Sequence, residues 1–476
     1  MRQPARDSRF RLGWTLALTS LAFFMVGFDA LVVLTALPAI QRDLGASLDS
    51  LQWSVNAYSL AWAASITTAV ALGDRYGRRR WFAIGLTMFA VASGICALAP
   101  NIEILVAARV AQGIGAGLIM PLSLTILTSA FGPERRGTIV GIWGGIAGIA
   151  VAAGPLIGGA ITQNLTWHSV FWLNVPLGIL AALLSLRQLS ESVGPPTQLD
   201  LFAVAFISGS AVGIVLGLVR GSALGWASAA TIATLGGGLV LMVCFVAWEL
   251  RAPAPMLPMR LFRSVRFSAA NTTGFFQSGA VFGGIFLVTQ YFQLAVGNSP
   301  VETGLRLLPW TGAPLLFSPL AGALSDRLGR RPLLVSGMLA QAASFAWFAW
   351  LASASVEYWR LAIPMALTGL GVAMVLPVAP TAALSAVERE DIGKASGVNS
   401  TLQRFGGAFG VAVATSVFAA YGSLNSPTAF IAGFRPSVTV IAGLAVLGAL
   451  AAFGVGNAPA VAPVSSVPDL GGAPAT

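Results

Sequence analysis

The chain has 476 residues, of which 56% are hydrophobic and only 9% are charged. Soluble globular domains carry about 25% charged residues, so this composition excludes a string of soluble domains and makes lipid the expected solvent. The formal net charge is +10. The basic residues nevertheless stand singly or in short clusters between long apolar runs, which is typical of membrane topology rather than of nucleic-acid binding.

The first apolar stretch begins near Gly13, after a tail that carries four arginines. No short hydrophobic region with a cleavage site follows this tail, so we expect the first span to be retained. Cys96 and Cys244 are the two cysteines, and both lie inside apolar runs, where a thiol packs as a small hydrophobic group. They indicate neither a disulfide nor a metal framework.

Fourteen apolar runs follow one another along the chain, each near the ~20 residues that a helix needs to cross a bilayer. Together they predict an all-α integral membrane protein with fourteen transmembrane helices. The approximate ranges are 13–37, 51–72, 81–99, 103–127, 137–161, 168–187, 201–219, 228–249, 268–293, 303–324, 332–352, 359–384, 395–421 and 436–456.

The distribution of Lys and Arg between alternate loops predicts the orientation, because basic loops stay in the cytoplasm. With both termini inside, the inner segments hold 20 Lys and Arg residues, whereas the outer loops hold only Arg42, Arg220, Arg360 and Arg435. A miscount by one helix would destroy this alternation. The sequence therefore predicts a multi-pass protein of the cell membrane with both termini in the cytoplasm.

The second half of the chain repeats features of the first half. The segment 72–80, LGDRYGRRR, resembles 324–332, LSDRLGRRP, and their aspartates, Asp74 and Asp326, are 252 residues apart. Glycines recur at a spacing of 256 in the pairs Gly113 and Gly369, Gly115 and Gly371, and Gly141 and Gly397. Two related six-helix halves explain this common register.

This repeat divides the chain into four parts. We predict an N-terminal six-helix half over 1–190, two inserted transmembrane helices with their linkers over 191–255, and a C-terminal six-helix half over 256–456. The inserted pair has no counterpart in the repeat. The remaining segment, 457–476, is rich in Pro, Ala and Gly and is predicted to be disordered.

With these motifs the chain resembles the major facilitator superfamily and, within it, the fourteen-helix drug:proton antiporter family. The motif after the second span is matched by Gly73, Asp74, Arg75, Gly77, Arg78 and Arg79. The fourth-span pattern is matched by Arg109, Gln112, Gly113, Gly115 and Gly117, and the fifth-span antiporter pattern by Gly154, Pro155, Gly158 and Gly159. The first span carries the family's aspartate, Asp29, with Ala36, Leu37 and Pro38 downstream. The resemblance implies the major facilitator fold and proton-coupled export.

Asp29 and Arg109 are ionisable residues inside predicted spans, where a charge costs at least ~2.5 kcal/mol unless it faces a cavity or a partner. At 1.5 Å per residue, Asp29 lies roughly 12 Å and Arg109 roughly 10 Å from the outer ends of their helices. The two side chains can therefore share one layer. We predict that Asp29 binds and releases the coupling proton and that Arg109 modulates this step. The alternative is an ion pair that only fixes helix packing.

The short inner loop after the second span has two interpretations. Its arginines and Gly77 are explained by topology and by a turn. The resemblance implies a conformational latch that holds the outward-open form, in which the loop of one half meets helix ends of the other half through Asp74. A carboxylate near a helix N-terminus is favoured by the helix dipole. The predicted latch residues are Gly73, Asp74, Arg75, Gly77, Arg78, Arg79, Asp326 and Arg327.

The fifth span contains several G-x-x-x-G spacings, which let helix backbones approach closely. Taken alone they indicate tight packing. Together with the family pattern they predict a gating helix that moves against its neighbours, with the key positions Gly154, Pro155, Gly158 and Gly159.

Polar and aromatic residues within spans are candidates for substrate contacts, although most such residues pack in the core or face lipid. The candidates are Asn56, Tyr58, Trp62, Gln277, Gln290 and Arg404. Arg404 differs from the others because no Asp or Glu lies within the predicted spans of its half. It could face water, a carbonyl group or an anionic part of a substrate.

The favoured function is therefore a secondary active transporter that exports amphipathic or drug-like molecules by alternating access, driven by the proton gradient without another cofactor. A uniporter or importer of a specific metabolite and a membrane sensor that does not transport are alternatives. A membrane enzyme is disfavoured because His168 is the only histidine and no cluster of catalytic or metal-binding residues is evident. Expected partners are a small-molecule substrate, protons and the bilayer, not nucleic acid. The sequence does not specify the oligomeric state, for which a monomer is the simplest expectation.

Overall fold

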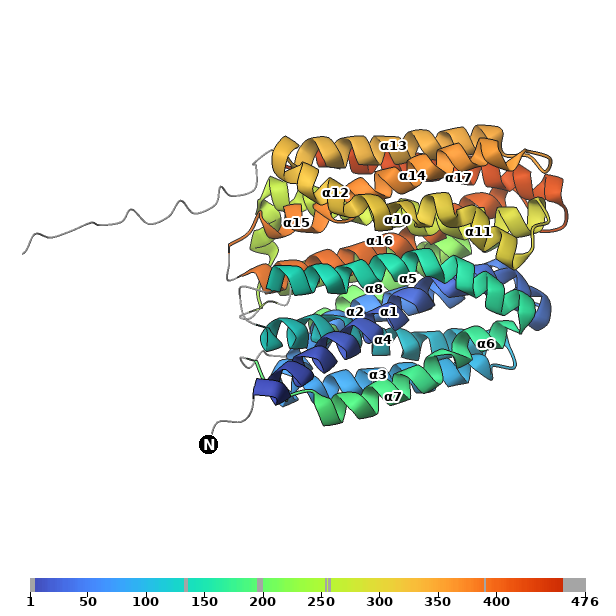
Figure 1. The fold of residues 1–476 in the computed structure, drawn as a ribbon. Coiled ribbons are helices and arrows are strands. Elements are labelled where there is room, and N and C mark those ends of the chain that lie inside the picture. The colour runs from blue at the N-terminus through green and yellow to red at the C-terminus, as the bar shows by residue number, and fades with distance from the viewer. Residues whose placement is uncertain are drawn as a thin grey trace, which may run out of the picture.

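The computed structural model describes residues 5–131, 136–194, 200–252, 255, 258–388 and 391–456. Within these ranges the backbone forms helices and no strands, as predicted. Figure 1 shows the long helices running side by side along one common direction, with the first and last parts of the chain on opposite sides of the bundle.

The N-terminal part forms seven helices, because one predicted span is broken at Leu173. The side chains of Ser47 and Asn101 cap two of them by accepting backbone N–H groups of the first turn. The helices are α1 (Ala5–Leu44), α2 (Leu48–Tyr76), α3 (Arg78–Ala97), α4 (Ile102–Ala130), α5 (Arg136–Asn164), α6 (Trp167–Trp172) and α7 (Asn174–Gln188).

The C-terminal part has further breaks that the apolar pattern does not reveal. One lies at Gly312, which is followed by Pro314 in the first turn of the next helix, and another lies at Pro377. The elements are η2 (Met259–Arg263), α10 (Val265–Gln290), η3 (Tyr291–Ala295), α11 (Pro300–Thr311), α12 (Ala313–Leu328), α13 (Arg330–Leu351), α14 (Tyr358–Val375), α15 (Val378–Leu384), α16 (Ile392–Tyr421) and α17 (Pro427–Ala452).

The two inserted helices, α8 (Leu201–Leu224) and α9 (Ala229–Glu249), pack against each other, and α8 also contacts α2 and α16. Gly213 and Gly238 lie where α8 and α9 approach most closely, since a Cβ atom at Gly213 would stand 2.8 Å from the Cα atom of Gly238. The pair therefore covers one side of the bundle, where α2 and α16 meet.

A helix or a pair of consecutive helices occupies each of the fourteen predicted ranges. By length and hydropathy, eleven helices among the described residues could cross a membrane, or twelve if the bent α2 is one span. α5 and α16 lie outside that set. The all-helical membrane fold is therefore confirmed, whereas the count of fourteen spans and the domain boundaries remain predictions.

The internal repeat is visible in the packing of the glycines. Gly113 approaches the backbone of Tyr58, and Gly369 approaches the backbone of Trp310, which lies 252 residues after Tyr58. In the same way Gly115 faces Gly85 and its counterpart Gly371 faces Gly337, again 252 residues apart. Equivalent glycines thus let equivalent helix pairs touch in both halves.

The two halves meet along α2 and α16 on one side and along α5 and α11 on the other. Three hydrogen bonds join them near the end of the bundle where α1 ends and α2 begins, which is the predicted outer end. Gln293 Nε2 donates to the carbonyl of Thr35 over 3.0 Å, and the backbone N–H of Val301 donates to Gln163 Oε1 over 3.2 Å. The third bond links Thr415 to Gln52. This end is therefore closed by contacts between the halves.

Candidate functional site

Asp29 lies at the centre of a buried polar network in the N-terminal half. Its side chain is 0% exposed and projects from α1. Arg109 Nη1 on α4 donates to Oδ2 of Asp29 in a direct ion pair. Gln112 Nε2 and Asn174 Nδ2 donate to Oδ1 over 2.8 and 2.9 Å. Three donors from two other helices thus hold one carboxylate away from water.

Arg109 is as deeply buried as its partner and makes several further contacts. Its Nε donates to the carbonyl of Ser54 over 3.0 Å, and its Nη1 also donates to Gln112 Oε1 over 2.8 Å. The guanidinium carbon lies 4.0 Å from the centre of the Tyr58 ring, a cation–π arrangement. A buried cation is expensive unless it is paired and hydrogen-bonded, and Arg109 meets both conditions.

Asn174 connects this network to the α3 and α6 helices. Its Nδ2 donates to Ser93 Oγ over 3.2 Å, and Ser93 Oγ donates to the carbonyl of Phe171 over 2.8 Å. The short break at Leu173 places Asn174 at the first position of α7, directed toward Asp29. The site therefore draws on six of the seven helices of the N-terminal half, all but α5.

The predicted pair of Asp29 and Arg109 is thus brought into contact, with Tyr58 beside it. Gln112 was noted in the sequence only as a motif residue, and no site role was assigned to Asn174, Ser54 or Ser93. Gln112 gives a usable signal, because it stands three residues after Arg109 and so shares its helix face. Ser54 contributes only its carbonyl, which no side-chain pattern reveals.

Asn56, Gln277 and Gln290 are buried. Gln341 Nε2 donates to Gln277 Oε1 over 2.7 Å, and Gln290 Nε2 donates to the carbonyl of Phe286 over 3.3 Å. Both glutamines therefore bind neighbours within the C-terminal half. Neither amide atom of the Asn56 side chain has a hydrogen-bond partner.

Trp62 and Arg404 meet where the two halves face each other. The guanidinium carbon of Arg404 on α16 lies 3.4 Å from the centre of the Trp62 ring on α2. Trp62 is buried and Arg404 is half-buried. Of the six predicted substrate contacts, these two residues and Tyr58 form one group.

The predicted latch loop contacts the segment that follows α7. Arg78 Nη2 pairs with Asp74 Oδ1 at 2.7 Å, and the backbone N–H of Gly194 donates to the carbonyl of Asp74 over 3.0 Å. Glu191 Oε1 accepts the backbone N–H of Arg79 over 2.9 Å. A contact of Asp74 with the other half is not among the interactions of the described residues.

The remaining latch residues have varied surroundings. The guanidinium of Arg75 lies 5.3 Å from the ring centre of Tyr76, and Arg327 is exposed. A Cβ atom on Gly73 would collide with Leu122. Gly77 has a φ of 111°, which favours glycine, and Glu191 lies directly beside it. The side chain of Asp326 lies outside the described residues.

The predicted gating glycines lie at close helix contacts. Cβ atoms at Gly154 and Gly158 would meet Leu31 and Val32 of α1 at 2.9 and 2.6 Å. Gly159 faces the backbone of Pro300 at the start of α11, and a Cβ atom at Gly304 would stand 2.5 Å from the carbonyl oxygen of Pro155. At these glycines the backbone of α5 lies close to α1 of its own half and to α11 of the other half.

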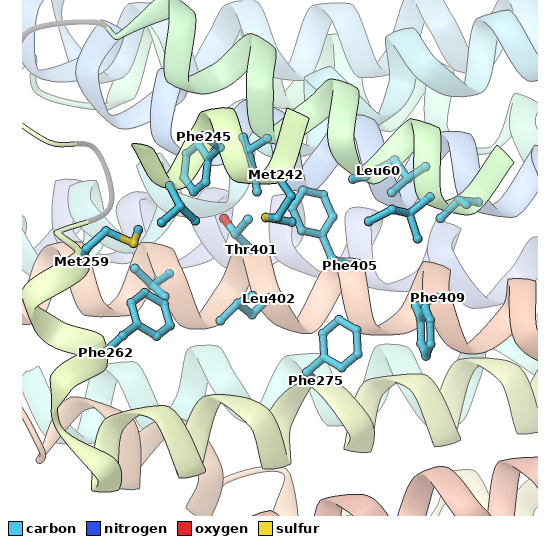
Figure 2. A pocket seen from close by; sticks show the side chains of 16 residues that line it. Leu60, Met242, Phe245, Met259, Phe262, Phe275, Thr401, Leu402, Phe405 and Phe409 are labelled. Atoms are coloured by element: carbon cyan, nitrogen blue, oxygen red, sulfur yellow. The ribbon is translucent and has the colours of Figure 1, made fainter. Parts of the chain in front are cut away.

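A cavity of about 500 Å³ lies between the inserted helices and the bundle, as Figure 2 shows. Met242 and Phe245 of α9 face Thr401, Leu402 and Phe405 of α16 across it. A second cavity of about 640 Å³ lies among α2, α3, α4 and α8. Both are lined almost entirely by apolar side chains, so α8 lies between two apolar cavities.

Comparison with known proteins agrees with this architecture. A peptide transporter, POT, of known crystal structure superposes with a TM-score of 0.67 over 93% of this chain and 93% of that chain, at 17% identity. A POT family transporter solved with 5-aminolevulinic acid gives a TM-score of 0.68 over 92% and 94% of the two chains, at 16% identity. These likenesses concern the fold.

Curated proteins match more closely in sequence. The tetracenomycin C resistance and export protein of Streptomyces glaucescens is 36% identical over 86% of this chain and 76% of that protein. The multidrug resistance protein Stp of Mycobacterium tuberculosis is 37% identical over the same shares. The family model described as Major Facilitator Superfamily matches residues 19–304 and 272–472. The chain belongs to the major facilitator superfamily of membrane transporters.

Proposed function

We propose that this protein exports amphipathic small molecules across the cell membrane in exchange for protons, with Asp29 as the proton carrier. Several relatives that are at least 30% identical carry names that refer to resistance, export or multidrug transport. The observation that carries the proposal is the buried contact between Asp29 and Arg109. Ionisable pairs inside a membrane bundle commonly mark ion pathways.

The mechanism follows from competition for one carboxylate. A proton arriving at Oδ2 of Asp29 takes the position that Arg109 now occupies. Arg109 can leave this position because the carbonyl of Ser54, Gln112 and the ring of Tyr58 still hold it. Protonation of Asp29 therefore breaks the ion pair between α1 and α4 without abandoning a buried cation, while Gln112 keeps its hydrogen bond to Oδ1.

Alternating access links this exchange to the two ends of the bundle. Asp29 is 0% exposed, so a proton reaches it only when the bundle opens. The contacts between the halves close the predicted outer end, which corresponds to an inward-facing form if both termini are cytoplasmic. In this form no interaction among the described residues joins the loop around Asp74 to the other half, and closure of the inner end would bring the loop there as the proposed latch.

The gating role of α5 belongs to the same proposal. Gly154 and Gly158 contact α1, which carries Asp29, while Gly159 contacts α11 of the other half. A shift of α1 on protonation would thus reach the closed outer end through one helix. The proton gradient is the only energy source that this scheme requires.

The test compares Asp29→Asn with Asp43→Asn, a matched control on the same helix whose carboxylate is 53% exposed. Inverted vesicles containing each variant receive an imposed pH gradient and a panel of lipophilic cations, lipophilic acids and antibiotics. We expect substrate-dependent proton release with the wild type and Asp43→Asn, and at least a tenfold loss with Asp29→Asn. Proton-driven export that survives in Asp29→Asn contradicts the proposal.

A further inference from the structure

Arg404 occupies the middle of the seam between the two halves. It stands 12 residues after the start of α16 and 17 before its end, and Trp62 is the central residue of α2. Substrate sites in transporters built from two repeats lie near the bilayer midplane, at the interface of the repeats. Arg404 therefore stands where cargo is expected to bind.

No carboxylate among the described residues balances the charge of Arg404. Among the residues that the structure describes, Arg404 makes no ion pair, and its contact is with the ring of Trp62. Arg109, which is fully buried, is already neutralised by Asp29. The pairing of Arg109 with Asp29 leaves the positive charge of Arg404 without a counter-charge among the described residues at the centre of the molecule.

The geometry also leaves the hydrogen-bond donors of Arg404 available. Trp62 covers one face of the guanidinium plane, whereas the N–H groups of a guanidinium point outward in that plane. No described side chain or carbonyl accepts them. A planar fork of donors held by stacking matches a carboxylate or a similar oxyanion, and it distinguishes these groups from an ammonium ion.

The apolar residues near Arg404 and Trp62 favour a ligand whose remaining part is apolar. Thr401, Leu402 and Phe405, which flank Arg404 on α16, line the apolar cavity of Figure 2. On the other side Trp62 contacts Tyr58 edge to face, with ring centres 5.6 Å apart. Apolar and aromatic side chains thus lie within one helical turn of Arg404 on α16 and of Trp62 on α2, and Arg404 itself is not among the residues that line the cavity.

We propose that Arg404 recognises an anionic oxygen group, a carboxylate or an acidic phenolate, on an otherwise apolar and aromatic cargo. This inference rests on the proposed export function and names its substrate class. Lipophilic cations are then poor substrates, because Arg404 repels them. The competing explanation is that Arg404 only stacks on Trp62 to hold the seam together.

Three dansyl probes with the same fluorophore separate these explanations. Dansylglycine carries a carboxylate, its methyl ester is neutral, and dansylcadaverine carries an ammonium group. Binding is measured by fluorescence on purified protein in nanodiscs, without a pH gradient. We expect the wild type to bind dansylglycine at least tenfold more tightly than the ester or the amine.

Variants then assign the preference to one side chain. Arg404→Gln should reduce dansylglycine affinity about tenfold and leave ester binding unchanged, while Arg404→Lys should retain part of the preference. Arg306→Gln is the matched control, since Arg306 already binds Asn298 Oδ1 at 2.9 Å. A wild type that binds no dansylglycine or does not prefer it, or an Arg404→Gln protein that still prefers it, overturns the inference.

The readout is independent of proton coupling. Asp29→Asn should keep the preference for acid over ester even though it loses proton-driven export. Failure of the export proposal therefore appears in vesicles, and failure of the Arg404 inference appears in the binding ratio. Arg404→Gln protein that does not purify as a single species leaves the wild-type comparison to decide.

Discussion

Tyr58 and Trp62 contact each other edge to face one turn apart on α2, and the guanidinium group of an arginine lies over each ring. Arg109, over Tyr58, is bound to Asp29 in the N-terminal half. Arg404, over Trp62, comes from the C-terminal half. Neighbouring side chains on one helix thus join the buried carboxylate to the interface between the halves, and this contact would link the proposed proton site to the proposed cargo site.

Trp62→Leu should weaken binding of dansylglycine about threefold to tenfold, because the stacking that fixes Arg404 contributes about 0.5–2 kcal/mol. Trp62→Phe keeps an aromatic face and should lose less. Trp53→Leu, on the same helix but in the wall of the second cavity, is the control. Equal affinities for Trp62→Leu and Trp53→Leu would show that the stacking does not position Arg404.

Arg109→Gln should destabilise the protein by about 3–5 kcal/mol, because it leaves the carboxylate of Asp29 buried without its counterion. The double variant Asp29→Asn with Arg109→Gln removes both charges and should regain much of this loss. Thermal unfolding in detergent measures the recovery. Proton-coupled export should remain absent in the double variant, and a double variant no more stable than Arg109→Gln would contradict the pairing.

Gly304→Ala should hinder closure of the outer end, because the new Cβ atom would stand 2.5 Å from the carbonyl oxygen of Pro155. Overpacking of this kind costs about 1–3 kcal/mol, enough to lower the ratio of closed to open molecules about tenfold or more. Gly322→Ala is the control, since nothing lies within 4 Å of its Cβ position.

The opening is measured as a distance between spin labels at Leu165 and Tyr421, which are exposed at the outer ends of the two halves. The Gly304→Ala protein should show a longer distance than the wild type, and the Gly322→Ala protein should not. Identical distributions in both variants would mean that α5 and α11 tolerate the extra atom by local adjustment.

Glu191→Gln should loosen the segment after α7 from the latch loop. Glu191 accepts the N–H of Arg79 and pairs with Arg79 and Arg80 at 3.5 and 3.7 Å. Because these pairs are partly exposed, the expected loss is about 0.2–1 kcal/mol, or up to about fivefold in local opening. The rate of alkylation of a cysteine introduced at Ser192 reports it, with Glu388→Gln as the control in the other half.

The sequence alone predicted the layer shared by Asp29 and Arg109, because both interrupt apolar runs and helical rise converts position into depth. It could not predict that Asn174 joins them, since Asn174 is 145 residues away from Asp29 and its direction depends on the break at Leu173. Apolar periodicity does not record such breaks.

The contact between the two halves was likewise only partly predictable from the sequence. Arg404 was recognisable as an unusual cation in an apolar span, but its stacking on Trp62 depends on how α2 and α16 face each other. The position of α8 beside both helices is likewise invisible in the sequence, because an insertion without a repeat counterpart has no register to follow. Contacts between distant segments required the folded structure.

Inside the spans the repeat preserves glycines but not the charges of Asp29 and Arg109. Residues 256 after Arg109 and 252 after Asp29 are Met365 and Val281, so the C-terminal half has no copy of the ion pair. The two halves share the close helix contacts at equivalent glycines but differ in the ionisable residues inside their spans. If Arg404 binds the cargo as proposed, changes around it would alter cargo recognition without touching the ion pair of Asp29 and Arg109 in the other half.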